Sequence, residues 1–288
     1  MKDYHIHSIY SEDGEYTPEE LVRLCVENDI SAMSITDHNT VKGVAEGLIA
    51  AERAEIRLIP GIEIDCIFGP FELHILGYGI DTGRHEYLDI ENNIHEQIQE
   101  VSRKRLKLVQ AEGFRICEEE LAAAPQNPHW PGNWTGELFA EVLLNKQEEA
   151  ENPLLLPYRA GGSRSDNPYV NFYWDFCGPG KSCFVPIRYP DASEMIELIH
   201  RTGGEAVLAH PGQTLTKHVE WLPEIISMGL DGIEAYSSYH TPDQCRYYHQ
   251  AAEKAGLCIT CGSDYHGKNK PAIRPGGHGL ADDSFVSL

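Results

Sequence analysis

Short apolar segments alternate with amphipathic helical patterns in two blocks of the sequence. In the first block YHIH and SAMSITDHN each precede a helical pattern, and IRLIPGIEID and FELHILGYG follow as further strands. In the second block helical patterns separate EAVLAHPG, LDGIEAY and LCITCGSDYHG. Strands separated by helices are typical of βα units around a parallel sheet. The alternation therefore predicts an α/β fold built on a parallel sheet.

The stretch between the two blocks has a different composition. One long helical pattern covers residues 87–113, and its apolar face carries Ile94, Ile98, Val101 and Leu108. Residues 120–185 are rich in Pro, Asn, Gly and aromatic residues, which is typical of an insertion that covers a site. We therefore expect a barrel domain at residues 1–85 and 186–288, with an inserted, mainly helical or irregular substrate-capping subdomain at residues 86–185.

The charge of the chain restricts its partners. The formal net charge is −22, from 23 Lys and Arg against 45 Asp and Glu. Proteins that bind long nucleic acids neutralise many phosphates with Lys and Arg, and no basic run here could do so. A small anionic substrate remains compatible if the site supplies local positive charge. No apolar run is long enough to span a membrane, and the first strand leaves no room for a signal peptide, so we expect a cytoplasmic protein.

Eight cysteines are scattered through the chain, and two of them form a CxxC motif. Cys258 and Cys261 lie in an apolar strand, where side chains three residues apart point to opposite faces. Two interpretations are open for this pair: buried structural cysteines or a redox pair.

Potential metal ligands stand at the ends of the predicted strands. His5 and His7 share one face of the first strand because side chains alternate along a strand. In a parallel βα barrel, functional residues gather at the carboxyl ends of the strands. Imidazoles and carboxylates are ligands of zinc, manganese and iron. Besides this pair, the candidates are Asp13, Asp37, His38, Glu63, His74, His210, Asp264 and His266. A lone buried histidine is commonly a core residue, but packing does not explain six of them at successive strand ends.

The ordered motifs HIH…D, TDH, GIE, LHILGYG, LAHPG and GSDYHG resemble those of the PHP (polymerase and histidinol phosphatase) family of metal-dependent phosphoesterases. The resemblance covers about residues 3–80 and 190–267. It implies a distorted (β/α)7, TIM-like barrel and three divalent ions of manganese, iron or zinc.

The resemblance also implies a division of the ligands among three ions. The first would be held by His5, His7, Glu63 and Asp264. Glu63 would bridge to a second ion, held by His74 and His210. The third would be held by Asp13, His38 and His266. Asp37 is outside this set, and it is either a partner that orients a histidine or a solvated turn residue.

Three ions against three carboxylates leave a surplus of about three positive charges, which would attract a phosphate group. In the implied reaction a hydroxide that bridges the metals attacks phosphorus in line. We predict Glu63, Asp264 and His240 as catalytic residues. PHP relatives often carry a histidine in the loop of His240, where it could protonate the leaving oxygen or bind phosphate; the alternative is a helix-capping or exposed histidine.

Basic residues of the insertion are candidates for a second anionic group of the substrate. Lys181 lies in GPGKSCFVP, which is similar to a segment of the same branch of the family. Arg159, Arg164 and Arg188 either bind substrate or are solvated loop charges.

One departure from the family bears on the substrate. Nucleotide-cleaving relatives have an Arg-Pro-His element at the start of a helix in this insertion, and NWTGELFAEVL here has neither the Arg nor the His. We therefore expect a small phosphorylated sugar, namely a five-membered cyclic phosphate diester such as phosphoribosyl cyclic phosphate, which is opened and then dephosphorylated. The alternatives are a nucleoside 3′,5′-bisphosphate 3′-phosphatase or RNA 5′-end exonuclease, then a histidinol phosphate phosphatase, then an inert metal-binding module.

Overall fold

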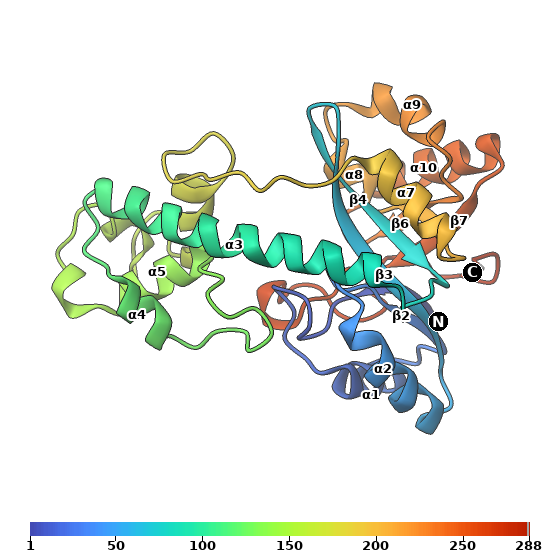
Figure 1. Cartoon of the computed structure of the whole chain (residues 1–288), viewed down its shortest axis with the longest axis horizontal. Helices are drawn as coiled ribbons and strands as arrows, with labels where there is room; N and C mark the ends of the chain where they lie inside the picture. The colour runs from blue at the N-terminus through green and yellow to red at the C-terminus, as the bar shows by residue number, and fades with distance from the viewer. Residues whose placement is uncertain (287) are drawn as a thin grey trace. The chain divides into compact units, whose positions relative to one another are not determined.

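The computed structural model describes residues 1–286 and 288. These divide into two compact units, Met1–Asn92 with Tyr189–Leu288, and Asn93–Arg188. Within the described residues of the first unit, seven strands form one sheet in chain order (Figure 1). They are β1 (Lys2–Ile6), β2 (Ala32–Ile35), β3 (Arg57–Phe68), β4 (Phe71–Tyr78), β5 (Glu205–Leu208), β6 (Gly232–Ser237) and β7 (Cys258–Gly262).

The sheet is parallel except at β4. β1, β2 and β3 pair in parallel, as do β5, β6 and β7. β4 runs antiparallel to both β3 and β5. The expectation of a fully parallel sheet is therefore wrong at this strand. Only Gly69 and Pro70 separate β3 from β4, and such a tight turn reverses the chain, because a parallel crossover needs a dozen or more residues.

The two edges of the sheet meet through the segments that follow β1 and β7. The amide of His7 donates to the carbonyl of Tyr265 over 3.0 Å, and the amide of Asp264 donates to the carbonyl of His5 over 2.8 Å. Ile6 and Tyr265 form an isolated parallel bridge. The sheet is thus a nearly closed barrel, and the predicted distorted (β/α)7 barrel is confirmed.

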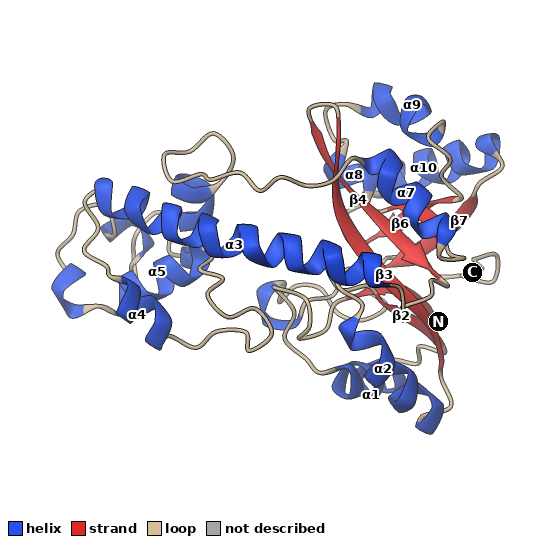
Figure 2. Ribbon diagram, in the orientation of Figure 1, coloured by secondary structure: helices blue, strands red, loops and turns tan. Residues whose placement is uncertain are grey.

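Helices cover the outside of this barrel (Figure 2). Thr17 caps the first helix through a capping box with Glu20, and Pro18 occupies its first position, where a missing N–H costs nothing. The helices of the first unit are α1 (Pro18–Glu27), α2 (Lys42–Arg53), α7 (Ala192–Arg201), α8 (Pro211–Thr214), α9 (Leu222–Ile226) and α10 (Pro242–Ala255), with short turns η4 (Val219–Trp221) and η5 (Gly267–Asn269).

The second unit has its own hydrophobic core. The long helix α3 (His85–Ala111) has residues in both units. Its bounds lie within two residues of the helix that the apolar periodicity predicts at 87–113. Phe114, Phe139, Leu143 and Phe172 are among the buried side chains that pack together there. The remaining elements are α4 (Glu118–Ala123), α5 (Gly136–Asn145), η1 (Gln147–Glu149), η2 (Leu156–Tyr158), α6 (Pro168–Phe172) and the π-helical turn η3 (Tyr173–Cys177).

None of the described helices is both long enough and apolar enough to cross a membrane. The eight cysteines, all within the described part of the chain, are free thiols. Burial raises the pKa of Cys258 to about 12 and that of Cys261 well above its ordinary value. Because the thiolate is the reactive form, this environment favours the structural interpretation of the CxxC motif.

The closure of the barrel leaves no space at Gly262. A Cβ atom there would lie 2.2 Å from His5 Cβ and 2.9 Å from His5 N. We expect Gly262→Ala to push β7 away from β1 and to lower the free energy of unfolding by roughly 1–3 kcal/mol, measured by chemical denaturation. Gly83→Ala is the matched control, because a Cβ there meets only a side-chain oxygen of Asp81 at 3.3 Å. Equal stability of the two variants would contradict this account of the closure.

Candidate metal centre

The cluster begins with the two histidines of the first strand. His5 lies in β1 and His7 just after it, and both side chains are fully buried. The Nε2 atom of His5 lies 3.1 Å from Glu63 Oε2 and 3.2 Å from Asp264 Oδ1. The Nε2 atom of His7 lies 3.2 Å and 2.9 Å from the same two oxygens. β1, β3 and the segment after β7 therefore bring the first predicted group of four residues together.

Glu63 also faces a second group. Its Oε1 atom lies 2.9 Å from His74 Nδ1 and 3.0 Å from His210 Nε2. Its Oε2 atom faces His5 and His7, so the two oxygens of one buried carboxylate point to two different sets of imidazoles. His74 lies inside β4 rather than at a strand end. In the hairpin of β3 and β4 it stands opposite Asp65.

The third predicted group lies beside the first. The Nε2 atom of His266 is 3.0 Å from Asp13 Oδ2. Ligand atoms of Asp13, His38 and His266 lie within 4.8 Å of one another and of His7. The side chain of Asp13 is 38% exposed, whereas that of His266 is fully buried. All nine predicted ligands therefore belong to one continuous cluster.

Two residues of the cluster have a strained backbone. His210 has φ of +24° and Asp264 has φ of +55°. Residues other than glycine rarely adopt such angles, and the strain persists chiefly at functional sites, where surrounding contacts hold it. Each residue lies two positions after the end of a strand, where the strained turn aims its side chain at the cluster.

Several buried atoms of the cluster have no hydrogen-bond partner among the described residues, since their contacts with neighbouring nitrogens or oxygens lack hydrogen-bond geometry. They include His5 Nε2, His7 Nε2, Glu63 Oε2, Asp264 Oδ1 and His266 Nε2. Such atoms cost free energy unless something satisfies them. Imidazole nitrogens and carboxylate oxygens without thiolates are ligands of zinc, manganese and iron. The donor set therefore fits divalent metal ions.

Burial and neighbouring charges set the protonation states in the cluster. Burial, with the charges of His266 and His38, lowers the pKa of His7 to about 4, so its ring is neutral. Burial opposes ionisation of Glu63, but the charges of His5 and His38 outweigh it and hold the pKa of Glu63 well below its usual value. Neutral imidazole and ionised carboxylate are the forms that bind metal ions.

His74 shows the opposite shift, as do His5 and His38, whose pKa values the neighbouring carboxylates hold well above the usual range although burial acts to lower them. Burial acts to lower the pKa of His74, but Glu63 and Asp65 outweigh burial and raise it to about 10. A ring that is protonated at neutral pH must lose its proton before its nitrogen can hold an ion, so metal binding at His74 releases a proton.

The family model of the PHP domain matches residues 3–151, just over half of the 288 residues. The chain belongs to the PHP family. It is therefore a hydrolase that acts on phosphate ester bonds, as the named relatives of this PHP chain also indicate.

Three curated relatives are each 27% identical to this PHP chain. The 5′-3′ exoribonuclease Rnm of Salmonella typhimurium matches over 92% of this chain and 84% of its own length. The phosphoribosyl 1,2-cyclic phosphate 1,2-diphosphodiesterase of Eggerthella lenta matches over 93% and 95%. The 3′,5′-nucleoside bisphosphate phosphatase of Chromobacterium violaceum matches over 92% and 86%.

Among solved structures, an amidohydrolase from Chromobacterium violaceum with bound sulfate and no metal has a similar fold. It has a TM-score of 0.74 and 25% sequence identity, and the match covers 95% of this PHP chain and 93% of that one.

Asp65 is a residue of the cluster that the sequence analysis missed. Its Oδ1 atom lies 3.0 Å from His38 Nδ1 and 3.4 Å from His74 Nε2. Its Oδ2 atom accepts a hydrogen bond from the side-chain amide of Asn39 over 2.8 Å. One carboxylate thus contacts a histidine of the second group and one of the third. Its position two residues after Glu63, on the same face of β3, could have identified it.

Glu234 is a second residue that was missed. It is fully buried in β6. Its Oε1 atom lies 3.0 Å from His5 Nδ1, and its Oε2 atom accepts a hydrogen bond from the backbone amide of His210 over 2.8 Å. A carboxylate on the far nitrogen of a ligand histidine fixes the orientation of its ring. Glu234 therefore positions His5 of the first group and His210 of the second.

Asp37 fulfils neither expectation, that it orients a histidine or lies in a solvated turn. Its carboxylate is buried and accepts hydrogen bonds from the amide and hydroxyl of Ser8, over 2.5 Å and 2.7 Å. Burial raises the pKa of Asp37 to about 6. Its role is to hold the loop that leaves β1.

His240 has both ring nitrogens engaged by backbone groups. Nδ1 donates to the carbonyl of Ala235 over 2.9 Å, and Nε2 accepts from the amide of Gly212 over 2.9 Å. These contacts correspond to the helix-capping alternative, because Gly212 lies in the first turn of α8. To donate a proton to a leaving group, His240 would have to give up one of these bonds.

The basic residues of the insertion that were predicted to bind substrate belong to the second unit. Arg164 forms a bidentate pair with Asp175. Arg159 donates to backbone carbonyls of residues 144 and 149, whereas Lys181 is exposed. Both arginines thus have partners within their own unit.

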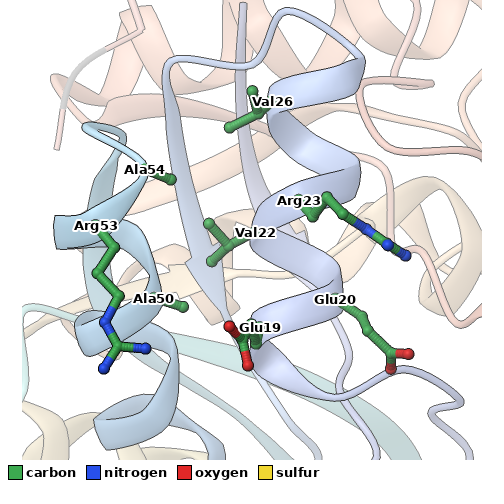
Figure 3. A pocket seen from close by; sticks show the side chains of 8 residues that line it. All are labelled: Glu19, Glu20, Val22, Arg23, Val26, Ala50, Arg53 and Ala54. Atoms are coloured by element: carbon green, nitrogen blue, oxygen red, sulfur yellow. The ribbon is translucent and has the colours of Figure 1, made fainter.

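An open groove between α1 and α2 is separate from the cluster (Figure 3). Val22 and Val26 of α1 face Ala50 of α2 and Ala54, the residue that follows α2. Its lining contains none of the nine predicted ligands, and its few charges belong to Glu19, Glu20, Arg23 and Arg53.

The position of Asp65 predicts its effect on metal binding. We expect Asp65→Ala to weaken metal binding roughly 10- to 100-fold, because the rings of His38 and His74 lose the carboxylate that orients them. Metal titration followed by elemental analysis measures the effect. Glu52→Ala, at an exposed position of α2, is the control. Unchanged metal affinity in a folded Asp65→Ala protein would remove Asp65 from the centre.

Proposed function

We propose that this PHP phosphoesterase opens a five-membered cyclic phosphate diester of a small sugar, such as phosphoribosyl cyclic phosphate, and then removes the resulting phosphate. The observation that carries the proposal is the carboxylate of Glu63, whose two oxygens face separate sets of imidazoles. Adjacent positive centres can bind a diester and rebind the monoester that it yields. Cytoplasmic location, expected from the sequence, belongs to the same proposal.

The proposed centre holds three divalent ions of manganese, iron or zinc. His5, His7, Glu63 and Asp264 would hold one, Glu63, His74 and His210 the second, and Asp13, His38 and His266 the third. When bound, such ions neutralise phosphoryl oxygens and activate water for attack on phosphorus. Three divalent ions exceed the charge of the three ligand carboxylates by about three, and the neighbouring carboxylates of Asp65 and Glu234 reduce this surplus to about one. The net positive charge favours a phosphate despite the acidic composition of the chain.

The residues of the chain contribute orientation and charge. Glu234 and Asp65 fix the rings of His5 and His38, so that the metal-facing nitrogens are already placed before substrate arrives. The burial of Glu63 and His5 keeps water away from one side of the centre, which strengthens electrostatic interactions there.

Two features favour the cyclic sugar phosphate. The Eggerthella lenta diphosphodiesterase is matched over 95% of its length. The helix α5 begins with Gly136 after Thr135 and lacks the Arg-Pro-His element of nucleotide-cleaving relatives.

A second candidate is cleavage of nucleoside 3′,5′-bisphosphates or RNA ends. It is supported by the Rnm exoribonuclease and the bisphosphate phosphatase, which are as similar to this chain as the cyclic phosphate enzyme is. The two candidates require the same metal chemistry and differ in what holds the base and sugar.

Phosphate release distinguishes the candidates. We expect the metal-loaded protein to release phosphate from ribose 1,2-cyclic phosphate esters at least 10-fold more efficiently than from a nucleoside 3′,5′-bisphosphate or a short 5′-phosphorylated RNA, an order-of-magnitude expectation for a site that lacks specific contacts to a base. Faster turnover of the bisphosphate or RNA would overturn the proposed substrate. Absence of turnover of any phosphate ester, with full metal content, would favour the inert module.

Asp13 tests the number of ions. We expect Asp13→Ala to lower bound metal from about three equivalents toward about two, because Asp13 is the only carboxylate proposed for the third ion. Elemental analysis and circular dichroism measure metal content and fold. Asp89→Ala, 71% exposed on α3, is the control. Equal metal content in the two variants would exclude Asp13 from the centre.

A further inference from the structure

We propose that Lys270 binds the phosphoryl group of the substrate at the metal centre, as a fixed positive charge supplied by the chain itself. The inference rests on the phosphoesterase function and holds for a sugar or a nucleotide substrate. Lys270 follows the short turn η5, outside every motif of the sequence analysis.

The ammonium of Lys270 contacts the cluster through Asp264. Nζ donates to Asp264 Oδ2 over 2.7 Å. The other oxygen, Oδ1, faces His5 and His7 at 3.2 Å and 2.9 Å. Lysine and histidines thus share the two oxygens of one carboxylate. An ammonium has three N–H donors, so contact with Asp264 leaves donors for a second acceptor.

The surroundings of Lys270 place its ammonium at the edge of the metal-ligand cluster. Its Nζ lies 5.2 Å from the centre of the Tyr239 ring, and that ring in turn contacts the ring of His210 with centroids 5.7 Å apart. Asp13 is also close enough for its charge to act on Lys270. The lysine therefore contacts Asp264 of the first group directly and lies beside Tyr239, which contacts His210 of the second group. Its side chain is 29% exposed, within reach of solvent.

The turn before Lys270 is fastened to the loop that carries Asp13. The side-chain amide of Asn269 donates to the carbonyl of Asp13 over 2.5 Å, and the amide of Lys268 donates to Glu15 over 2.5 Å. Gly267, with φ of +71°, makes this approach possible, because a Cβ there would lie 2.3 Å from a carboxylate oxygen of Glu15. These contacts fix the backbone next to Lys270 relative to the loop of Asp13.

Lys270 is a positive charge next to a predicted metal ligand in an acidic chain. In the described part of the chain, Lys270 is the one lysine or arginine that forms an ion pair with a predicted metal ligand. A chain with net charge −22 repels phosphate until its carboxylates are neutralised. Once an ion shares the charge of Asp264, the ammonium has charge available for a phosphoryl oxygen, and lysine commonly binds phosphate as a point charge.

Lys270→Met tests the inference, with the exposed Lys268→Met as matched control. We expect Lys270→Met to keep its metal content, to bind inorganic phosphate roughly 10- to 100-fold more weakly by calorimetry, and to lose a similar factor in kcat/KM for an aryl phosphate. Lys270→Arg should recover part of the phosphate affinity, and Lys268→Met should behave like the unmodified protein.

Two results would overturn the inference. One is unchanged phosphate affinity in a fully metal-loaded Lys270→Met protein. The other is loss of metal with normal phosphate affinity after reloading at saturating metal, which would make Lys270 a positioning residue for Asp264. If the methionine variant does not fold, Lys270→Gln takes its place in the same comparison. Because inorganic phosphate and an aryl phosphate are the probes, the result is independent of whether cyclic sugar phosphates are the substrates.

Discussion

The buried carboxylate of Glu63 is the interaction on which the rest of the site depends. Its two oxygens face different sets of imidazoles, and a buried carboxylate is tolerated only with such partners. β3 makes this possible because it continues past the end of β2 into a hairpin with β4. The backbone of Glu63 is still held there, since its amide donates to Asp37 and its carbonyl accepts from Asn39. The antiparallel strand β4 is therefore what brings His74 next to a residue of a parallel strand.

A layer of acidic residues supports the imidazoles from behind. Glu234 contacts His5, and Asp65 contacts His38 and His74. Each buried carboxylate is stabilised by the histidine rings that it contacts. Removing either a histidine or an acid would leave its partner buried without a hydrogen-bond or charge partner, which costs free energy. The arrangement explains why so many ionisable groups lie in the interior of one barrel.

Much of the site could be predicted from the sequence, because strand parity and strand ends depend on local pattern. His5 and His7 share a face by alternation alone. The direction of β4 was mispredicted although Gly69 and Pro70 mark a tight turn. The helices that separate the other strands suggested a fully parallel sheet. The capping of α8 by His240 and the position of Lys270 depend on contacts between residues far apart in the chain. No local pattern encodes such contacts, whereas Asp65 could have been found from its parity with Glu63.

The hairpin of β3 and β4 has a consequence for the order in which the centre assembles. Glu63 and His74 lie on two strands that a two-residue turn joins, so their contact closes a short loop and forms at low entropic cost. His5 meets Asp264 only after nearly the whole chain has been made. The centre therefore combines ligands that one hairpin brings together with ligands from the two ends of the barrel sheet, so it is complete only when β1 and β7 have met.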